Sequence, residues 1–92
     1  MGKIRILLAD DHPLVRSGLI KMLEPFKDLT VVGEAEDGEA TVRLAAELRP
    51  DVVVIDLSMP KLTGIEATKL IRKNNPEIKV LVLTMHENEE YV

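Results

Sequence analysis

The sequence contains no cysteine and no tryptophan, and its aromatic residues are one phenylalanine and one tyrosine. Without cysteine the chain can form neither a disulfide framework nor a thiolate metal site, and a reducing compartment is permitted. No apolar run is long enough for a signal peptide or a membrane span, so we expect a soluble, cytoplasmic protein without membrane contact. Lysine and arginine do not cluster, and the formal net charge is -4, so we expect no nucleic-acid contact by this chain.

The composition that remains describes a small globular protein. The 46% hydrophobic content comes almost entirely from valine, isoleucine, leucine, alanine and methionine, which excludes an intrinsically disordered chain. The 92 residues allow one domain, and a chain of this length has little surface to bury and therefore little stability to spare. We expect a single domain over residues 1–92.

Residues 52–56 are predicted to form a buried strand. Val52 to Ile55 are apolar without alternation, which is typical of a central strand that is covered on both faces in a parallel sheet. Asp56 ends this run, at the edge where open α/β sheets bind their ligands. The same pattern also fits an ordinary turn, in which Ser58 and Pro60 follow a turn-opening aspartate.

Apolar spacing, proline and glycine predict the other elements. The pair Asp37-Gly38 is a hairpin signal, but the helical spacing of the residues after it favours a helix with Asp37 as its cap. Strands that alternate with helices predict an α/β fold with a parallel sheet. The further predicted strands are 3–9, 29–34 and 78–83; the helices are 13–24, 39–48 and 64–72, and residues 86–92 look like the first turns of another.

Four polar residues follow the predicted strands, namely Asp10, Asp11, Asp56 and Thr84. A parallel sheet places these strand ends at one edge, where neighbouring carboxylates repel and a divalent cation is the usual compensation. Because cysteine is absent and His12 and His86 stand singly, such oxygen ligands favour Mg²⁺ or Mn²⁺ over Zn²⁺. By themselves, the two adjacent aspartates also fit a solvated helix cap.

Four motifs occur in a fixed order: 6–19 (ILLADDHPLVRSGL), 31–38 (VVGEAEDG), 51–60 (DVVVIDLSMP) with Gly64 following, and 82–86 (VLTMH). Together they resemble the receiver domain of a two-component response regulator of the NarL/FixJ type, over residues 3–92. The resemblance implies a flavodoxin-like parallel sheet, with strand order 2-1-3-4 in this chain and helices on both faces.

The resemblance also implies a role for each residue of the motifs. Asp56 matches the phosphoacceptor, a carboxylate that takes a phosphoryl group from a sensor histidine kinase and holds it as an acyl phosphate. Asp11, Asp56 and the backbone carbonyl of Ser58 match the Mg²⁺ ligands, and Asp10 supports the ion. Thr84 matches the switch residue whose hydroxyl reports the modification. These roles describe a signalling domain and not an enzyme.

Part of the family pattern has no counterpart in the 92 residues. The family's fifth strand, with its lysine, its fifth helix and the DNA-binding helix-turn-helix domain of the NarL/FixJ type are missing. We therefore expect a truncated receiver whose fourth strand forms an apolar sheet edge. We also expect a symmetric dimer, through pairing of the fourth strands, packing of the uncovered faces or exchange of the terminal segment. The alternative is a receiver fragment that does not switch and serves as a folding or assembly module.

Two other classes of protein fit the sequence less well. Phosphatases of the haloacid dehalogenase type also use an aspartate nucleophile and Mg²⁺, but they place two acids two residues apart after one strand, whereas Asp10 and Asp11 are adjacent. A nucleotide-binding domain would need a glycine-rich phosphate loop after a strand, and no strand has one.

Overall fold

The computed structural model describes residues 3–56 and 61–83. Each predicted strand and helix up to residue 83 is found, and the largest difference is at the end of the third helix, which continues to Asn74. The helical turns expected at 86–92 lie outside the described residues. The elements are β1 (Ile4–Ala9), α1 (Pro13–Leu23), β2 (Leu29–Ala35), α2 (Gly38–Leu48), β3 (Val52–Asp56), α3 (Gly64–Asn74) and β4 (Lys79–Leu83).

The described strands form one sheet in the order β2-β1-β3-β4, and all three pairs are parallel. This confirms the predicted α/β fold and strand order. The hairpin alternative at Asp37-Gly38 is wrong, because Gly38 begins α2. Asp37 caps that helix as predicted, since its side chain accepts a hydrogen bond from the backbone N–H of Ala40 at 2.8 Å.

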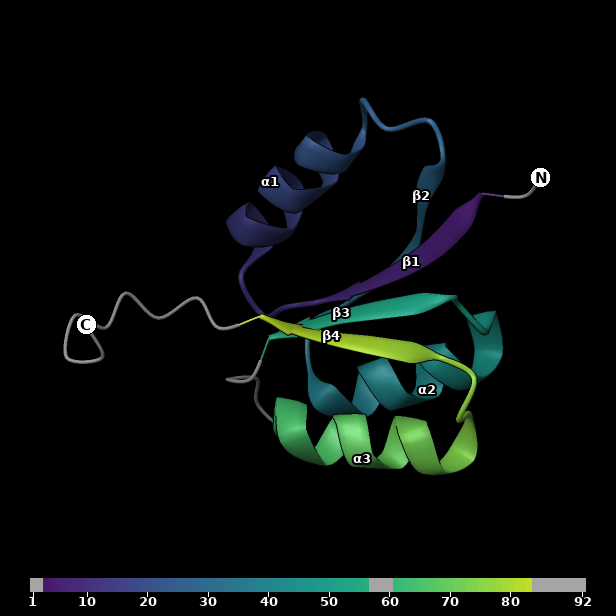
Figure 1. Cartoon of the computed structure of the whole chain (residues 1–92). Coiled ribbons are helices and arrows are strands. Elements are labelled where there is room, and N and C mark those ends of the chain that lie inside the picture. The colour runs from purple at the N-terminus through teal and green to yellow at the C-terminus, as the bar shows by residue number, and fades with distance from the viewer. Residues whose placement is uncertain (1–2, 57–60, 84–92) are drawn as a thin grey trace, which may run out of the picture.

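Helices cover both faces of the sheet, as predicted. Figure 1 shows α1 on one side, and α2 and α3 together on the other. The main core lies on the side of α2 and α3, because the fully buried side chains there come from both layers. Its buried members are Leu7, Ala9, Ala35, Ala45, Val53, Ile55, Ala67, Ile71 and Ile78.

The opposite face is covered less completely. Among residues 13–23, which form α1, none is fully buried, and Leu14 and Met22 are exposed. Val53 and Ile55 belong to the main core, so Val54 between them faces the α1 side of the sheet. Leu81 of β4 is the register partner of Val54 and lies on the same side, where it is 54% exposed. Apolar packing therefore holds α2 and α3 firmly against the sheet and holds α1 only loosely.

Candidate functional site

Asp10 and Asp56 lie side by side at the carboxyl edge of the sheet. Ala9 and Ile55 are register partners in the parallel pair of β1 and β3, and each aspartate directly follows one of them. Both are buried, with exposed fractions of 3% for Asp10 and 5% for Asp56. The two central strands of the sheet thus deliver buried carboxylates to one point, as the sequence predicted.

Asp11 and His12 complete a cluster around this point. One ligand atom from each of Asp10, Asp11, His12 and Asp56 lies within 4.8 Å of all the others. Unit charges about 4 Å apart interact with about 4 kcal/mol at an effective dielectric constant of about 20. A divalent cation between the carboxylates would replace this repulsion with attraction, and their oxygens are the ligands that Mg²⁺ prefers.

Asp11 supplies the observation that fits a cation best. Its Oδ1 is buried and accepts no hydrogen bond from the described residues, and His12 Nδ1, at 2.8 Å, forms an ion pair with it only when the imidazole is protonated. A buried carboxylate oxygen without a hydrogen bond is costly unless a cation or water satisfies it. The three aspartates therefore form a site that can hold a divalent cation, with the Asp11 oxygen available to bind it.

His12 takes part in this cluster more closely than the sequence predicted. Its backbone N–H donates to Asp10 Oδ1 at 2.7 Å, and its Nδ1 lies 3.2 Å from the same oxygen. The first contact is a local turn in which an aspartate side chain bonds the backbone two residues on, and it fixes the Asp10 carboxylate. One signal for this role is visible in the sequence, namely the position of His12 directly after the two acids.

The structure does not describe every predicted site residue. Ser58 and Thr84 lie outside the described residues, as does His86. The structure therefore brings together Asp10, Asp11 and Asp56.

Comparison with known proteins decides which family has this fold and site. A sequence profile described as the response regulator receiver domain matches residues 6–92. The chain belongs to the receiver domain family. The family match overturns the phosphatase and nucleotide-binding alternatives and confirms that this is a receiver domain of a two-component response regulator.

Individual relatives agree with this membership. The transcriptional regulatory protein LiaR of Bacillus subtilis is 49% identical over 89 residues, which cover 97% of this receiver domain and 42% of LiaR. The signal receiver domain of the response regulator NarL from Mycobacterium tuberculosis is 34% identical, with a TM-score of 0.89 over 100% of this chain and 74% of that one. The chain spans less than half of the length of LiaR.

A third relative was solved with a phosphoryl mimic. The isolated receiver domain of RcsB from Salmonella enterica serovar Typhimurium, in the presence of the phosphomimetic BeF₃⁻, is 38% identical. Its TM-score is 0.85, over 97% of this chain and 67% of that one.

In the described part of the receiver domain, no helix is long and apolar enough to cross a membrane.

Mg²⁺ is expected to stabilise the receiver domain against unfolding. A ligand that binds only the native state at about ten times its Kd adds about 1.4 kcal/mol, which raises the Tm of a small domain by about 5–10 °C. Asp11→Asn should remove most of this gain, because it neutralises the carboxylate whose buried oxygen lacks a hydrogen bond. Thermal unfolding followed by circular dichroism, in Mg²⁺ and in chelator, measures both. Coincident curves for the unmutated chain would mean that the acids bind no metal.

Proposed function

We propose that Asp56 is the phosphoacceptor of this receiver domain. A carboxylate oxygen of Asp56 attacks the phosphorus of a phosphohistidine on a sensor histidine kinase. The P–N bond breaks as the P–O bond forms, the electron pair stays on the imidazole nitrogen, and Asp56 becomes an acyl phosphate. The observation that carries this proposal is the position of Asp56, buried at the end of β3 and beside Asp10 and Asp11.

Asp10, Asp11, Asp56 and the backbone carbonyl of Ser58 would hold Mg²⁺. When bound, the ion neutralises charge on the carboxylates and on the phosphoryl oxygens. The chain's own contribution is to fix the position of the nucleophile, the Asp56 carboxylate. The backbone of Asp56 is paired with β4 through Leu83, so its carboxylate projects from a rigid strand end and can be aligned with the incoming phosphorus.

Thr84 is proposed as the switch residue. Leu83 is the register partner of Asp56, and Thr84 is the covalent neighbour of Leu83. This position in the sequence, next to the register partner of Asp56, supports the proposal that the Thr84 hydroxyl donates a hydrogen bond to a phosphoryl oxygen on Asp56. Such a bond would exist only in the phosphorylated state, so it can shift the balance between two conformations of the domain.

The receiver domain is proposed to act within a transcription regulator. The relative LiaR is a transcriptional regulatory protein, and the chain matches only 42% of its length, and both observations support this proposal. The signal would pass from a sensor histidine kinase through Asp56 to a DNA-binding output domain, with no DNA contact by the receiver domain itself. The alternative remains a receiver that does not switch and acts as an assembly module, which is favoured by the exposed apolar residues of β4.

Phosphorylation of Asp56 can be tested with a small phosphodonor. Acetyl phosphate with Mg²⁺ should label the chain, and peptide mass mapping should place the label within residues 51–60. Asp56→Asn should abolish labelling because the amide is not a nucleophile. Asp51→Asn is the matched control at the other end of β3. Its new amide oxygen can still accept the 2.8 Å hydrogen bond from the Arg5 N–H, so labelling should persist.

Three outcomes separate the proposals. Label on another residue, or undiminished label in Asp56→Asn, would overturn the assignment of Asp56. A folded chain that takes no label at all would favour the assembly module.

A further inference from the structure

The turn between β1 and α1 presents the acidic cluster, yet apolar packing does little to hold it. Among the described residues of α1 none is fully buried, and the exposed Leu14 lies in its first turn. His12 is the N-cap residue, and its side chain makes no capping hydrogen bond. Polar contacts must therefore fix the orientation of Asp11 relative to the sheet.

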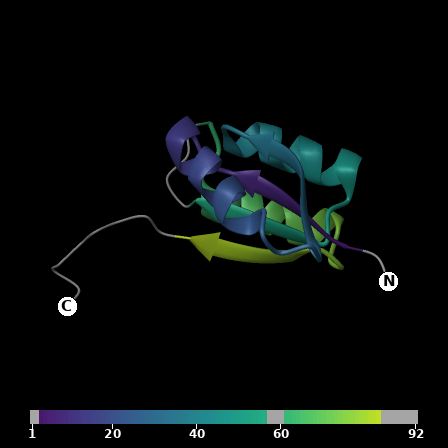
Figure 2. The ribbon, with the colours of Figure 1, turned by 90° about the horizontal axis from the view of Figure 1, so that it is seen from above.

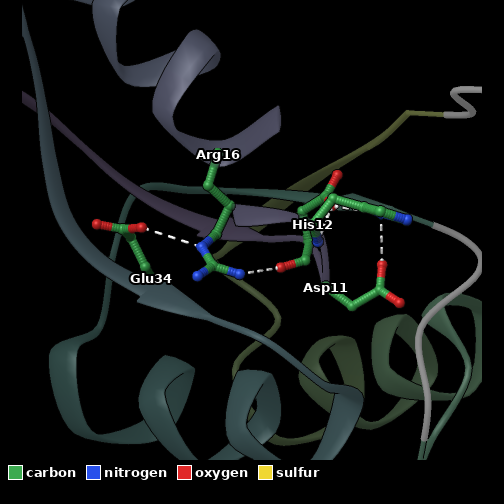
Figure 3. A network of polar contacts seen from close by, with 5 residues as sticks. Asp11, His12, Arg16 and Glu34 are labelled. Atoms are coloured by element: carbon green, nitrogen blue, oxygen red, sulfur yellow. Dashed lines mark hydrogen bonds and ion pairs between the residues drawn. The ribbon is translucent and has the colours of Figure 1, made fainter. Parts of the chain in front are cut away.

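Arg16 makes those contacts from the second turn of α1. Its Nε donates to Glu34 Oε1 at 3.0 Å, and its Nη1 donates to the backbone carbonyl of Asp10 at 2.5 Å. Figure 3 shows the guanidinium with Glu34 on one side and the acidic turn on the other. One side chain thus joins α1 to the end of β1 and to β2, and the planar fork of arginine donors holds both partners in a fixed geometry.

The carbonyl that Arg16 binds belongs to the peptide between Asp10 and Asp11. That peptide is planar, so holding its oxygen also fixes the direction in which the chain enters the Asp11 Cα. The rest of Asp10 is held as well, because its N–H donates to the carbonyl of Ala35 at 3.0 Å. Arg16 therefore completes the set of contacts that determines where the Asp11 carboxylate points.

Burial distinguishes this arrangement from an ordinary surface ion pair. The Glu34 side chain is 45% exposed, but the Arg16 side chain is only 14% exposed, so the guanidinium end of the pair is shielded from the solvent that screens fully exposed ion pairs. Glu34 lies on β2 opposite Leu8 in the parallel register, so it is anchored in the sheet. The Glu34 carboxylate holds the guanidinium in the orientation that reaches Asp10. Glu34 is itself paired with Arg16, and it lies outside the acidic cluster.

We infer that Arg16, oriented by Glu34, is a positioning residue for the metal and phosphoryl site, because it fixes the Asp10–Asp11 peptide. This inference rests on the proposed function and adds residues that none of the site assignments above contains. It predicts that the pair acts on Mg²⁺ affinity through the geometry of Asp11, without touching the ion.

The test measures Mg²⁺ affinity and stability separately. Calorimetric titration of Mg²⁺ into Arg16→Met should give a Kd about 10-fold higher, the scale on which residues that orient metal ligands act. Arg16→Lys keeps the charge but lacks the planar, fixed arrangement of donors, so its Kd should rise by an intermediate factor. Glu34→Gln keeps an acceptor oxygen and should have the smallest effect. Arg43→Met, at an exposed arginine on α2, is the matched control and should leave the Kd unchanged.

Thermal unfolding in chelator supplies the second readout. A lower Tm in chelator together with an unchanged Mg²⁺ Kd in Arg16→Met would assign Arg16 a purely structural role and overturn the inference. If Arg16→Met does not fold, Arg16→Lys still tests the inference. A Mg²⁺ Kd in the lysine variant equal to that of the unmutated chain would likewise overturn it. Failure of the unmutated chain to bind Mg²⁺ would overturn the proposed function together with this inference, whereas equal affinities in all variants overturn the inference alone.

Discussion

Gly38→Ala is expected to destabilise the fold by about 2 kcal/mol or more. A Cβ at this position would lie 2.0 Å from the backbone carbonyl oxygen of Leu62 and 2.5 Å from the Leu62 Cβ. Overpacking of this kind costs about 1–3 kcal/mol, and here the obstacle includes backbone, which cannot rotate away as a side chain can. For a domain of this size the loss corresponds to a fall of about 10 °C in Tm.

Leu62 has little freedom to move aside. It packs against the main core, and the next residue, Thr63, begins α3 with a capping box in which Thr63 and Glu66 exchange hydrogen bonds. The close approach of Gly38 therefore fixes Leu62, just before α3, against the start of α2. Relieving the clash would have to displace one of these two helix starts.

Gly18→Ala is the matched control for this experiment. Gly18 lies inside α1, and apart from its chain neighbours and the backbone of its own helix, no atom lies within 4 Å of the position that its Cβ would occupy. Alanine is favoured over glycine in a helix interior by about 1 kcal/mol, so this variant should be slightly more stable than the unmutated chain. Urea or thermal unfolding of both variants gives the comparison. Equal stability of Gly38→Ala and the unmutated chain would show that Leu62 can move aside without a loss of folding free energy.

The same glycine shows what the sequence could and could not predict. Asp37-Gly38 was correctly interpreted as a helix start, because capping and helical spacing are local and depend on neighbouring residues alone. The reason for glycine is the approach of Leu62, which is distant in sequence and follows from the packing of α2 against α3. Local patterns contain no information about such an approach.

Part of the candidate site could likewise be predicted from the sequence, and part could not. Asp10 and Asp56 could be placed together from the sequence, because parallel strands that end in acids must bring those acids to one edge. The contact of Arg16 with the Asp10 carbonyl could not, since it depends on how a loosely packed helix is tilted over the sheet. Apolar spacing likewise predicted a helix over 13–24, but it could not show that Met22 on that helix stays exposed.

The 92-residue chain on its own is expected to form a symmetric dimer through β4. Within the described sheet β4 is an edge strand, at the margin of the sheet in Figure 2. Leu81 and Val82 point to opposite faces and are 54% and 40% exposed, so the edge is apolar on both sides. Lys79 is the one charge along this strand, and an apolar edge with so little protection is a template for pairing.

Hydrogen-bond directions show how this pairing can be blocked. The Lys79 N–H donates to the carbonyl of Asp51 at 3.1 Å, next to β3, so the N–H groups of residues 80 and 82 point to the open edge by alternation. Val82→Pro therefore removes a donor that a second chain would use, while it leaves the ladder to β3 intact. Val82→Thr is the matched control, because it keeps both the N–H and the β-branched shape.

Light scattering after size exclusion, over a dilution series, gives the mass in solution. The unmutated chain and Val82→Thr should move from twice 10.3 kDa toward 10.3 kDa on dilution, and Val82→Pro should remain at the lower mass throughout. Leu81→Lys separates the two modes of association, because it places a charge on the incompletely covered face beside α1 and leaves the edge N–H groups in place. A dimer lost in Leu81→Lys but kept in Val82→Pro would mean that two copies pack face to face. A monomer at every concentration in the unmutated chain would contradict both modes, and would require the chain itself to cover β4.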